Sequence, residues 1–183
     1  MSQEMRDVRG AMIFLMLLLC GPLWAADGAA PMANGGAHGT LDLALNGHAL
    51  VAHLQLPALQ VVGFTHAPAD GEQRQAVSDA LQRLGNADNV LVPVAAGCTI
   101  TKEEAESSLA LSAADRALKE NADGNFRGYY AWHCGNPAAL RAVNVPLLEF
   151  MNGVALDILV VSGGERHRLT LRFPDTHLVI GGE

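Results

Sequence analysis

The stretch that most constrains the fold is residues 38–68, in which two runs of alternating leucines flank an Asn-Gly dipeptide. An alternation of period two places such leucines on one face of a strand and the residues between them on the other. Asn46 and Gly47 suit the positive φ angles of a two-residue turn, and Pro57 removes a backbone donor where the second run ends. The stretch therefore predicts a β-hairpin whose leucine face consists of Leu41, Leu43, Leu45, Leu50, Leu54 and Leu56.

One amphipathic helix is predicted after the hairpin. Asp70 stands at the N-cap position with Gln73 three residues later, and Gly85 marks the end of the helix. An apolar stripe at helical spacing lies between them, formed by Val77, Ala80, Leu81 and Leu84. Because a helix of this kind is stable only when its stripe is covered, we expect it to pack on the leucine face of the hairpin.

Further strands are predicted between turn signals at residues 97–101, 125–134, 154–161, 166–173 and 177–180. The strand at 154–161 is apolar on both faces except at Asp157, which predicts a central strand that is covered on both sides. In the strand at 125–134, Cys134 falls on the aromatic face and His133 on the opposite face. Residues 102–124 fit two interpretations equally, a short helix capped by Ser112 or a solvated insertion. About seven strands and one main helix predict an α+β domain with a mostly antiparallel sheet.

The N-terminus reads as a secretory signal peptide covering residues 1–25. Arg6 and Arg9 precede an apolar run at residues 11–20 that is too short to span a bilayer, and small residues follow it up to Ala25. A lipid-modified Cys20 is the competing interpretation, but the bulky Leu19 before it argues against lipoprotein processing. We therefore expect an exported chain without a membrane span after cleavage, a flexible leader at 26–37 and a single domain at 38–183.

The net charge of the chain is −7 at pH 7. An acidic protein repels the phosphates of nucleic acid and the head groups of anionic lipid, and it mildly favours cations. No nucleic-acid partner is therefore expected.

Cys98 and Cys134 are the two cysteines that remain after signal cleavage. An even pair in an exported chain predicts a disulfide, because the compartment is oxidising. A thiolate metal site is the alternative, but it needs reducing conditions and usually close Cys-x-x-Cys spacing, which this pair lacks.

Histidine is the residue type that can carry function in this chain, since the sequence holds no nucleophile elbow, zinc-protease motif, P-loop or dinucleotide fingerprint. We therefore predict that the protein is not an enzyme. Of the seven histidines, His38, His66 and His133 lie at strand ends or on a polar face, where metal ligands from separate elements can converge. The other four are interpreted as structural. Imidazole suits zinc and copper alike, so the residues alone do not select the metal.

A family resemblance is carried by four parts of the chain: the stretch 38–68, most specifically VGFTHAP at residues 62–68, then Gly97-Cys98, YAWHC at residues 130–134 and the segment 147–150. Together they resemble the ZrgA-type zinc-uptake family over residues 38 to about 180. The resemblance implies a periplasmic protein that binds zinc and assists a zinc ABC importer. It also implies that Cys98 and Cys134 are the cysteine pair of the family and that His66 is its motif histidine.

The chain departs from that family pattern where a histidine-rich loop is common. Residues 108–125 occupy that place and contain no histidine, and Thr65 replaces a frequent glutamate before His66. We therefore expect weakened or single-site zinc binding, with His66 as the first ligand and His38 and His133 next. The alternative is an exported protein-interaction module without metal, which binds a partner through an edge strand or the apolar segment 59–64.

Overall fold

The computed structural model describes residues 38–119, 123–151 and 153–180. The predicted signal peptide at 1–25 and the leader at 26–37 lie outside the described residues. None of the helices in the described part of the chain is long and apolar enough to cross a membrane.

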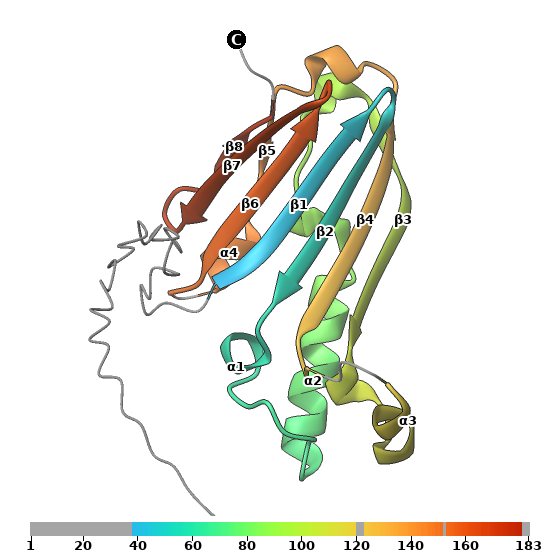
Figure 1. Cartoon of the computed structure of the whole chain (residues 1–183), viewed down its shortest axis with the longest axis vertical. Helices are drawn as coiled ribbons and strands as arrows, with labels where there is room; N and C mark the ends of the chain where they lie inside the picture. Colours follow the sequence, from blue (N-terminus) through green and yellow to red (C-terminus); the bar gives the residue numbers. More distant parts are fainter. Residues whose placement is uncertain (1–37, 120–122, 152, 181–183) are drawn as a thin grey trace, which may run out of the picture. The chain divides into compact units, whose positions relative to one another are not determined.

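The fold is α+β and mostly antiparallel, as predicted, and Figure 1 shows its main sheet. This sheet has six strands in the order β3-β4-β2-β1-β6-β7. Its strands are β1 (His38–Asn46), β2 (Ala49–Leu56), β3 (Cys98–Ser107), β4 (Phe126–Cys134), β6 (Ala155–Ser162) and β7 (Glu165–Arg172). A second, two-stranded sheet pairs β5 (Ala142–Asn144) with β8 (His177–Val179). The helices are α1 (Ala58–Val61), α2 (Gly71–Leu84), α3 (Ala113–Leu118) and α4 (Leu147–Phe150).

The hairpin of β1 and β2 forms as predicted, but its turn lies one residue further along the chain. Asn46 pairs with Ala49, so Gly47 and His48 are the two turn residues, and Gly47 adopts a φ of 57°. The predicted register and the observed one both keep the leucines on one face, which is why the alternation could not distinguish them. The observed register pairs Leu45 with Leu50 and places His48 at the tip of the hairpin.

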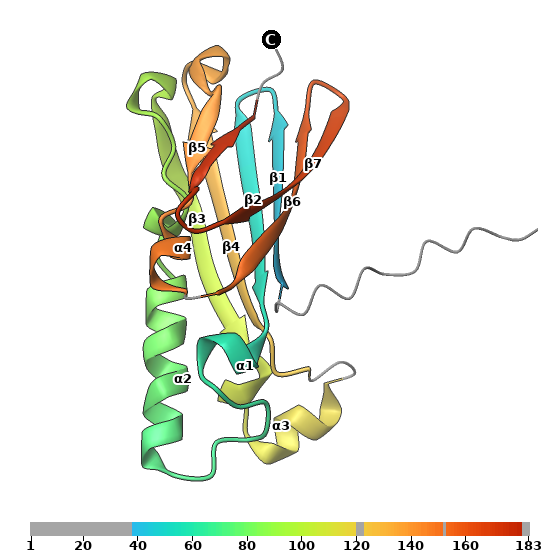
Figure 2. The same cartoon turned by 90° about the vertical axis from the view of Figure 1, so that its left-hand side faces the viewer.

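Helix α2 begins and ends as predicted but packs elsewhere. The Asp70 carboxylate accepts a hydrogen bond from the Gln73 amide at 2.8 Å, and Gly85 follows the last helical residue. Its contacts with the main sheet are chiefly with β3 and β4 rather than with the hairpin. Figure 2 shows α2, α4, β5 and β8 on the same side of the main sheet, where Val77 and Leu84 of α2 are buried.

Residues 102–119 resolve the ambiguity between a helix and an insertion in favour of the helix. Strand β3 continues to Ser107, and α3 follows it. The Ser112 hydroxyl caps α3 by accepting from the Asp115 amide at 3.2 Å. The guanidinium of Arg116 donates to the backbone carbonyls of Ser108 and Leu109, each at 3.0 Å, which ties the helix to the end of β3.

The pairing of β1 with β6 is parallel, and local sequence patterns do not reveal it. It joins the hairpin to the C-terminal strands and places Leu41 beside Ile158. The core side of the sheet holds the buried leucines of β1 and β2 together with Phe126 and Tyr130 of β4. Each such side chain, when fully buried, contributes roughly 1.5–3 kcal/mol of hydrophobic stabilisation.

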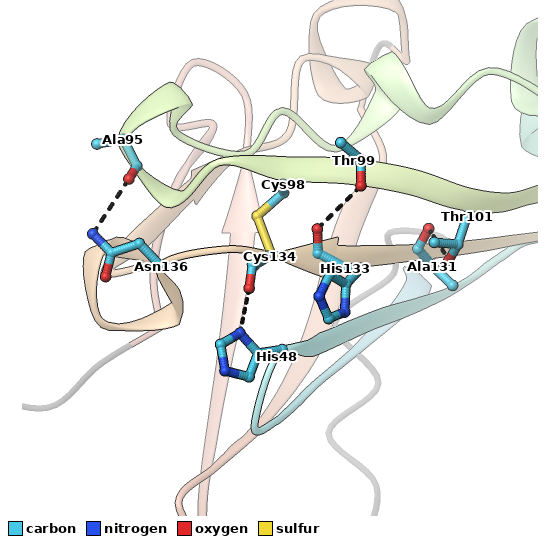
Figure 3. The surroundings of a disulfide bond; sticks show 9 residues. All are labelled: His48, Ala95, Cys98, Thr99, Thr101, Ala131, His133, Cys134 and Asn136. Carbon is cyan, nitrogen blue, oxygen red and sulfur yellow. Dashed lines mark hydrogen bonds between the residues drawn. A yellow bond between two sulfur atoms is a disulfide. The ribbon is translucent and has the colours of Figure 1, made fainter.

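The predicted disulfide is present between Cys98 and Cys134, with an S–S distance of 2.06 Å. The two cysteines are cross-strand partners at the start of β3 and the end of β4. Figure 3 shows this end of the sheet, where Cys98, Cys134, His48 and His133 lie close to one another.

Candidate functional site

The face of the main sheet opposite the core, called the open face below, carries the more polar half of most strands. Most of the side chains that could bind a ligand or a metal ion lie at its two ends and at its centre. On β1, β2 and β4 its residues include Thr40, Asp42, Val51, His53, Gln55, Arg127, Tyr129, Ala131 and His133. The open face exists because strands of period two send their leucines to the core and these residues outward.

A hollow of about 460 Å³ lies at the centre of the open face. Most of the charged groups around it have a charged partner. Lys102 Nζ lies 3.0 Å from a Glu104 carboxylate oxygen and 4.9 Å from the centre of the Tyr129 ring, while Arg127 Nη2 lies 2.6 Å from Asp123. Exposed pairs of this kind contribute little stability, but they leave few free charges to bind a ligand in the hollow.

His38 lies at the start of β1 and is hydrogen-bonded through both ring nitrogens. Its Nδ1 donates to Asp157 at 2.9 Å, and its Nε2 lies 3.4 Å from Nη2 of Arg172. The Thr170 hydroxyl donates to the other oxygen of Asp157 at 2.7 Å. This hydrogen bond is the main cause of the lowered pKa of Asp157, and the hydrogen bond and charge of His38 and the charge of Arg172 lower it further. A cation that binds Nε2 of His38 must displace the Arg172 guanidinium.

His66 lies in the loop between α1 and α2. Its Nδ1 lies 2.9 Å from the Ala67 carbonyl oxygen, and its ring stacks on Phe64 with centroids 5.2 Å apart. A carbonyl oxygen only accepts hydrogen bonds, so Nδ1 carries the proton and Nε2 keeps a lone pair. His66 therefore presents one metal-competent nitrogen to solvent.

His133 lies at the end of β4, far from His38. Along the sheet, His133 stands level with Ala49 and Asn46, and His38 is eight residues from Asn46. At about 3.3 Å per residue, the two histidines are roughly 26 Å apart along the strands. The structure therefore does not bring His38 and His133 together, and no group of three or more His, Cys, Asp or Glu side chains positioned to hold a metal occurs among the described residues.

His133 instead has a histidine neighbour that sequence reasoning assigned to a structural role. The ring of His48, in the hairpin turn, stacks against the ring of His133 with centroids 5.5 Å apart and planes inclined by 22°. The contact between His48 and His133 depends on the register between β2 and β4, in which Ala49 pairs with His133. No spacing in the sequence encodes that register, so no local signal could have singled out His48.

The fold and this geometry define a disulfide-bonded α+β domain that presents imidazole groups to solvent at separate points of one sheet. The family model described as ZrgA family zinc uptake protein matches residues 35–179. The chain belongs to this family, which is one of zinc uptake proteins and not a known enzyme family. A comparison with curated proteins finds no match.

Proposed function

We propose that this protein is a periplasmic accessory protein that binds zinc and assists its uptake by an ABC importer. The observation that carries the proposal is the family match over residues 35–179, which spans the chain from β1 to β8. The signal-peptide pattern at residues 1–25 supports export. The disulfide between Cys98 and Cys134 supports an oxidising compartment.

Zinc binding is proposed to be weak and confined to one structured site. Residues 108–125 contain no histidine, and part of this segment is folded as α3. This segment therefore cannot load zinc through a series of histidine side chains. His66 and His133 each expose an imidazole, whereas the ring of His38 is engaged by Asp157 and Arg172. Because His66, His38 and His133 do not form one three-histidine cluster in the described structure, the single site is proposed at one of them, with His66 the first choice and His38 and His133 next.

Calorimetric titration with zinc of the disulfide-bonded protein, purified without a histidine tag, tests this function. We expect heat that corresponds to at most one ion per chain, and a weaker isotherm when a ligand histidine is changed to alanine. His66→Ala, His38→Ala and His133→Ala are the variants to compare. A parent protein that gives no heat would overturn zinc binding.

The role in uptake has its own test in the host bacterium. Loss of this protein is expected to slow growth in zinc-depleted medium, and added zinc is expected to restore it. In a strain that already lacks the zinc ABC importer, loss of the protein should add no further defect. An additional defect of the same size in that strain would show that the protein does not act through the importer.

The metal-free alternative rests on exposed apolar surface. Leu59 of α1, in the apolar segment 59–64, is 57% exposed, and β3 and β7 are edge strands of the main sheet. If the protein is a protein-interaction module, the parent should bind no zinc. A strain with Leu59→Asp should then grow in zinc-depleted medium as slowly as a strain that lacks the protein. Zinc binding by the parent, together with normal growth of the Leu59→Asp strain, rejects it.

A further inference from the structure

His48 and His133 lie together at the end of the sheet that carries the disulfide, as Figure 3 shows. His48 lies at the tip of the β1–β2 hairpin, and His133 is the penultimate residue of β4. Both side chains are exposed. Two imidazoles thus approach each other in solvent, although no local sequence motif contains both of them.

His48 is fixed in both position and tautomer by Cys134. The Cys134 amide donates to the His48 carbonyl at 2.7 Å, and Nδ1 of His48 lies 2.7 Å from the Cys134 carbonyl oxygen. Because that oxygen can only accept, Nδ1 carries the proton and Nε2 keeps its lone pair. Histidines that bind metals are typically held in this way, with the other ring nitrogen donating to a carbonyl or carboxylate.

His133 supplies the second imidazole, and its ring is free to reorient. Among the residues that the structure describes, its side chain makes no hydrogen bond, while its backbone carbonyl accepts from the Thr99 hydroxyl at 3.4 Å. Two nitrogens bound to one tetrahedral zinc ion at 2.0–2.1 Å stand about 3.4 Å apart. The two rings are stacked, with centroids 5.5 Å apart and planes inclined by 22°, and the lone pairs of ring nitrogens lie in the ring planes. Because the hydrogen bond to Cys134 holds the His48 ring, the His133 side chain must turn out of this stack to bring a nitrogen beside Nε2 of His48.

The nearest cation along the sheet is directed away from the pair. Lys102 is the cross-strand partner of Ala131, two residues from His133. Its Nζ is held by Glu104 at 3.0 Å and lies over the Tyr129 ring, toward the centre of the open face. Its charge is therefore partly neutralised, and the net charge of the chain, −7, favours a cation at the surface.

We propose that His48 and His133 form an open zinc site, with Nε2 of His48 and a ring nitrogen of His133 as the protein ligands and water in the remaining positions. This inference deepens the zinc function proposed above and rests on it. An exposed site with two protein ligands leaves coordination positions open for the ligands of an acceptor. Such a site suits a protein that passes zinc on.

Histidine-ring nitrogen spectra recorded during zinc titration of the untagged, disulfide-bonded protein test the site directly. We expect zinc to shift Nε2 of His48 and a ring nitrogen of His133. The ring signals of His38, His53 and His66 should stay in place. Shifts at His38 or His66 without shifts at His48 would overturn the pair and leave the zinc function standing.

Two variants separate loss of a ligand from loss of structure. His48→Asn keeps an amide donor near the position of Nδ1, so the hydrogen bond to the Cys134 carbonyl can persist, but it lacks Nε2. His133→Ala removes an exposed ring that makes no hydrogen bond within the described chain. Each is expected to weaken zinc binding at least tenfold with an unchanged urea midpoint.

His53→Ala is the matched control. His53 is another open-face histidine, in edge contact with Tyr129 at 4.8 Å and without a histidine neighbour in the described structure. Its removal should leave zinc affinity unchanged. Equal zinc affinity of the parent and the His48→Asn, His133→Ala double variant would overturn the site, whereas absence of binding in the parent would overturn both the site and the proposed function.

Discussion

Nδ1 of His48 lies 2.7 Å from the backbone carbonyl oxygen of Cys134, so the tip of the first hairpin is attached to a residue of the disulfide. The same cysteine donates its amide to the His48 carbonyl at 2.7 Å. A residue of the disulfide therefore directly contacts the imidazole that we propose as a zinc ligand. Its removal should affect both stability and the position of this ring.

Changing both cysteines to alanine is expected to lower the free energy of unfolding by roughly 3 to 4 kcal/mol, because the bond closes a long loop in the unfolded chain. The sequence separation of the two cysteines is 36 residues. Urea denaturation measures the loss. The parent protein under reducing conditions is the matched comparison, and a loss below about 1 kcal/mol would contradict a structural role for the bond.

Tyr130→Phe tests a buried hydrogen-bond network at the end of α2. The Tyr130 hydroxyl donates to the Leu84 carbonyl at 2.6 Å and accepts from the Asn89 side chain at 3.3 Å. Removing the hydroxyl leaves the Leu84 carbonyl without this partner in a buried place, while the Asn89 amide keeps its hydrogen bonds to the Arg83 and Asn86 carbonyls. We therefore expect a loss of about 1–3 kcal/mol in urea denaturation. Tyr129→Phe, on the open face, is the control and should change stability by less than about 0.5 kcal/mol.

The same tyrosine predicts sensitivity to alkali. Burial raises the pKa of Tyr130 to about 12, with a further increase from Glu103 and an opposing effect of the hydrogen bond from Asn89. The unfolded chain, with a tyrosine pKa near 10, releases this proton first, so stability falls as pH rises from about 10 to about 12. The stability advantage of the parent over Tyr130→Phe should therefore shrink across this range, and a constant difference would refute the assignment.

Thr170→Val tests the carboxylate next to His38. The Thr170 hydroxyl is the main cause of the lowered pKa of Asp157, so its loss should raise that pKa toward the ordinary value. A depressed carboxyl pKa stabilises the fold above the ordinary pKa of aspartate, and this contribution disappears as pH falls through the folded-state value. The stability difference between parent and variant should therefore be present at neutral pH and shrink in acid.

Carbon NMR of the Asp157 carboxyl during a pH titration measures the change directly. Thr99→Val, on β3 at the opposite end of the sheet, is the control and should leave the Asp157 titration unchanged. An unaltered Asp157 titration in Thr170→Val would show that the hydroxyl is not the cause.

Asp70→Ala tests the cap of α2. The Asp70 side chain accepts from the Gln73 amide at 2.8 Å, and its loss leaves a helix amide without this partner. We expect a loss of about 0.5–2 kcal/mol in thermal or urea unfolding. Asp70→Asn retains an accepting oxygen and should recover most of the stability, whereas equal losses in both variants would point to charge rather than capping.

The sequence alone determined the elements whose signals are local. The alternating leucines predicted β1 and β2, Asp70 and Gly85 predicted the ends of α2, and the even pair of cysteines predicted the disulfide. These signals are reliable because turns, caps and strand faces depend on residues a few positions apart. The same patterns failed where two arrangements satisfied them equally, as in the turn at Gly47–His48.

Only the tertiary structure decided which of these elements meet. The parallel pairing of β1 with β6, the packing of α2 on β3 and β4, and the contact of His48 with His133 join segments that are distant in sequence. Their relative positions follow from strand order and register, which are set by burial of the whole apolar face rather than by any single stretch. For this reason the sequence could identify imidazoles as the groups of interest, while only the fold separated His38 from His133 and placed His48 beside His133.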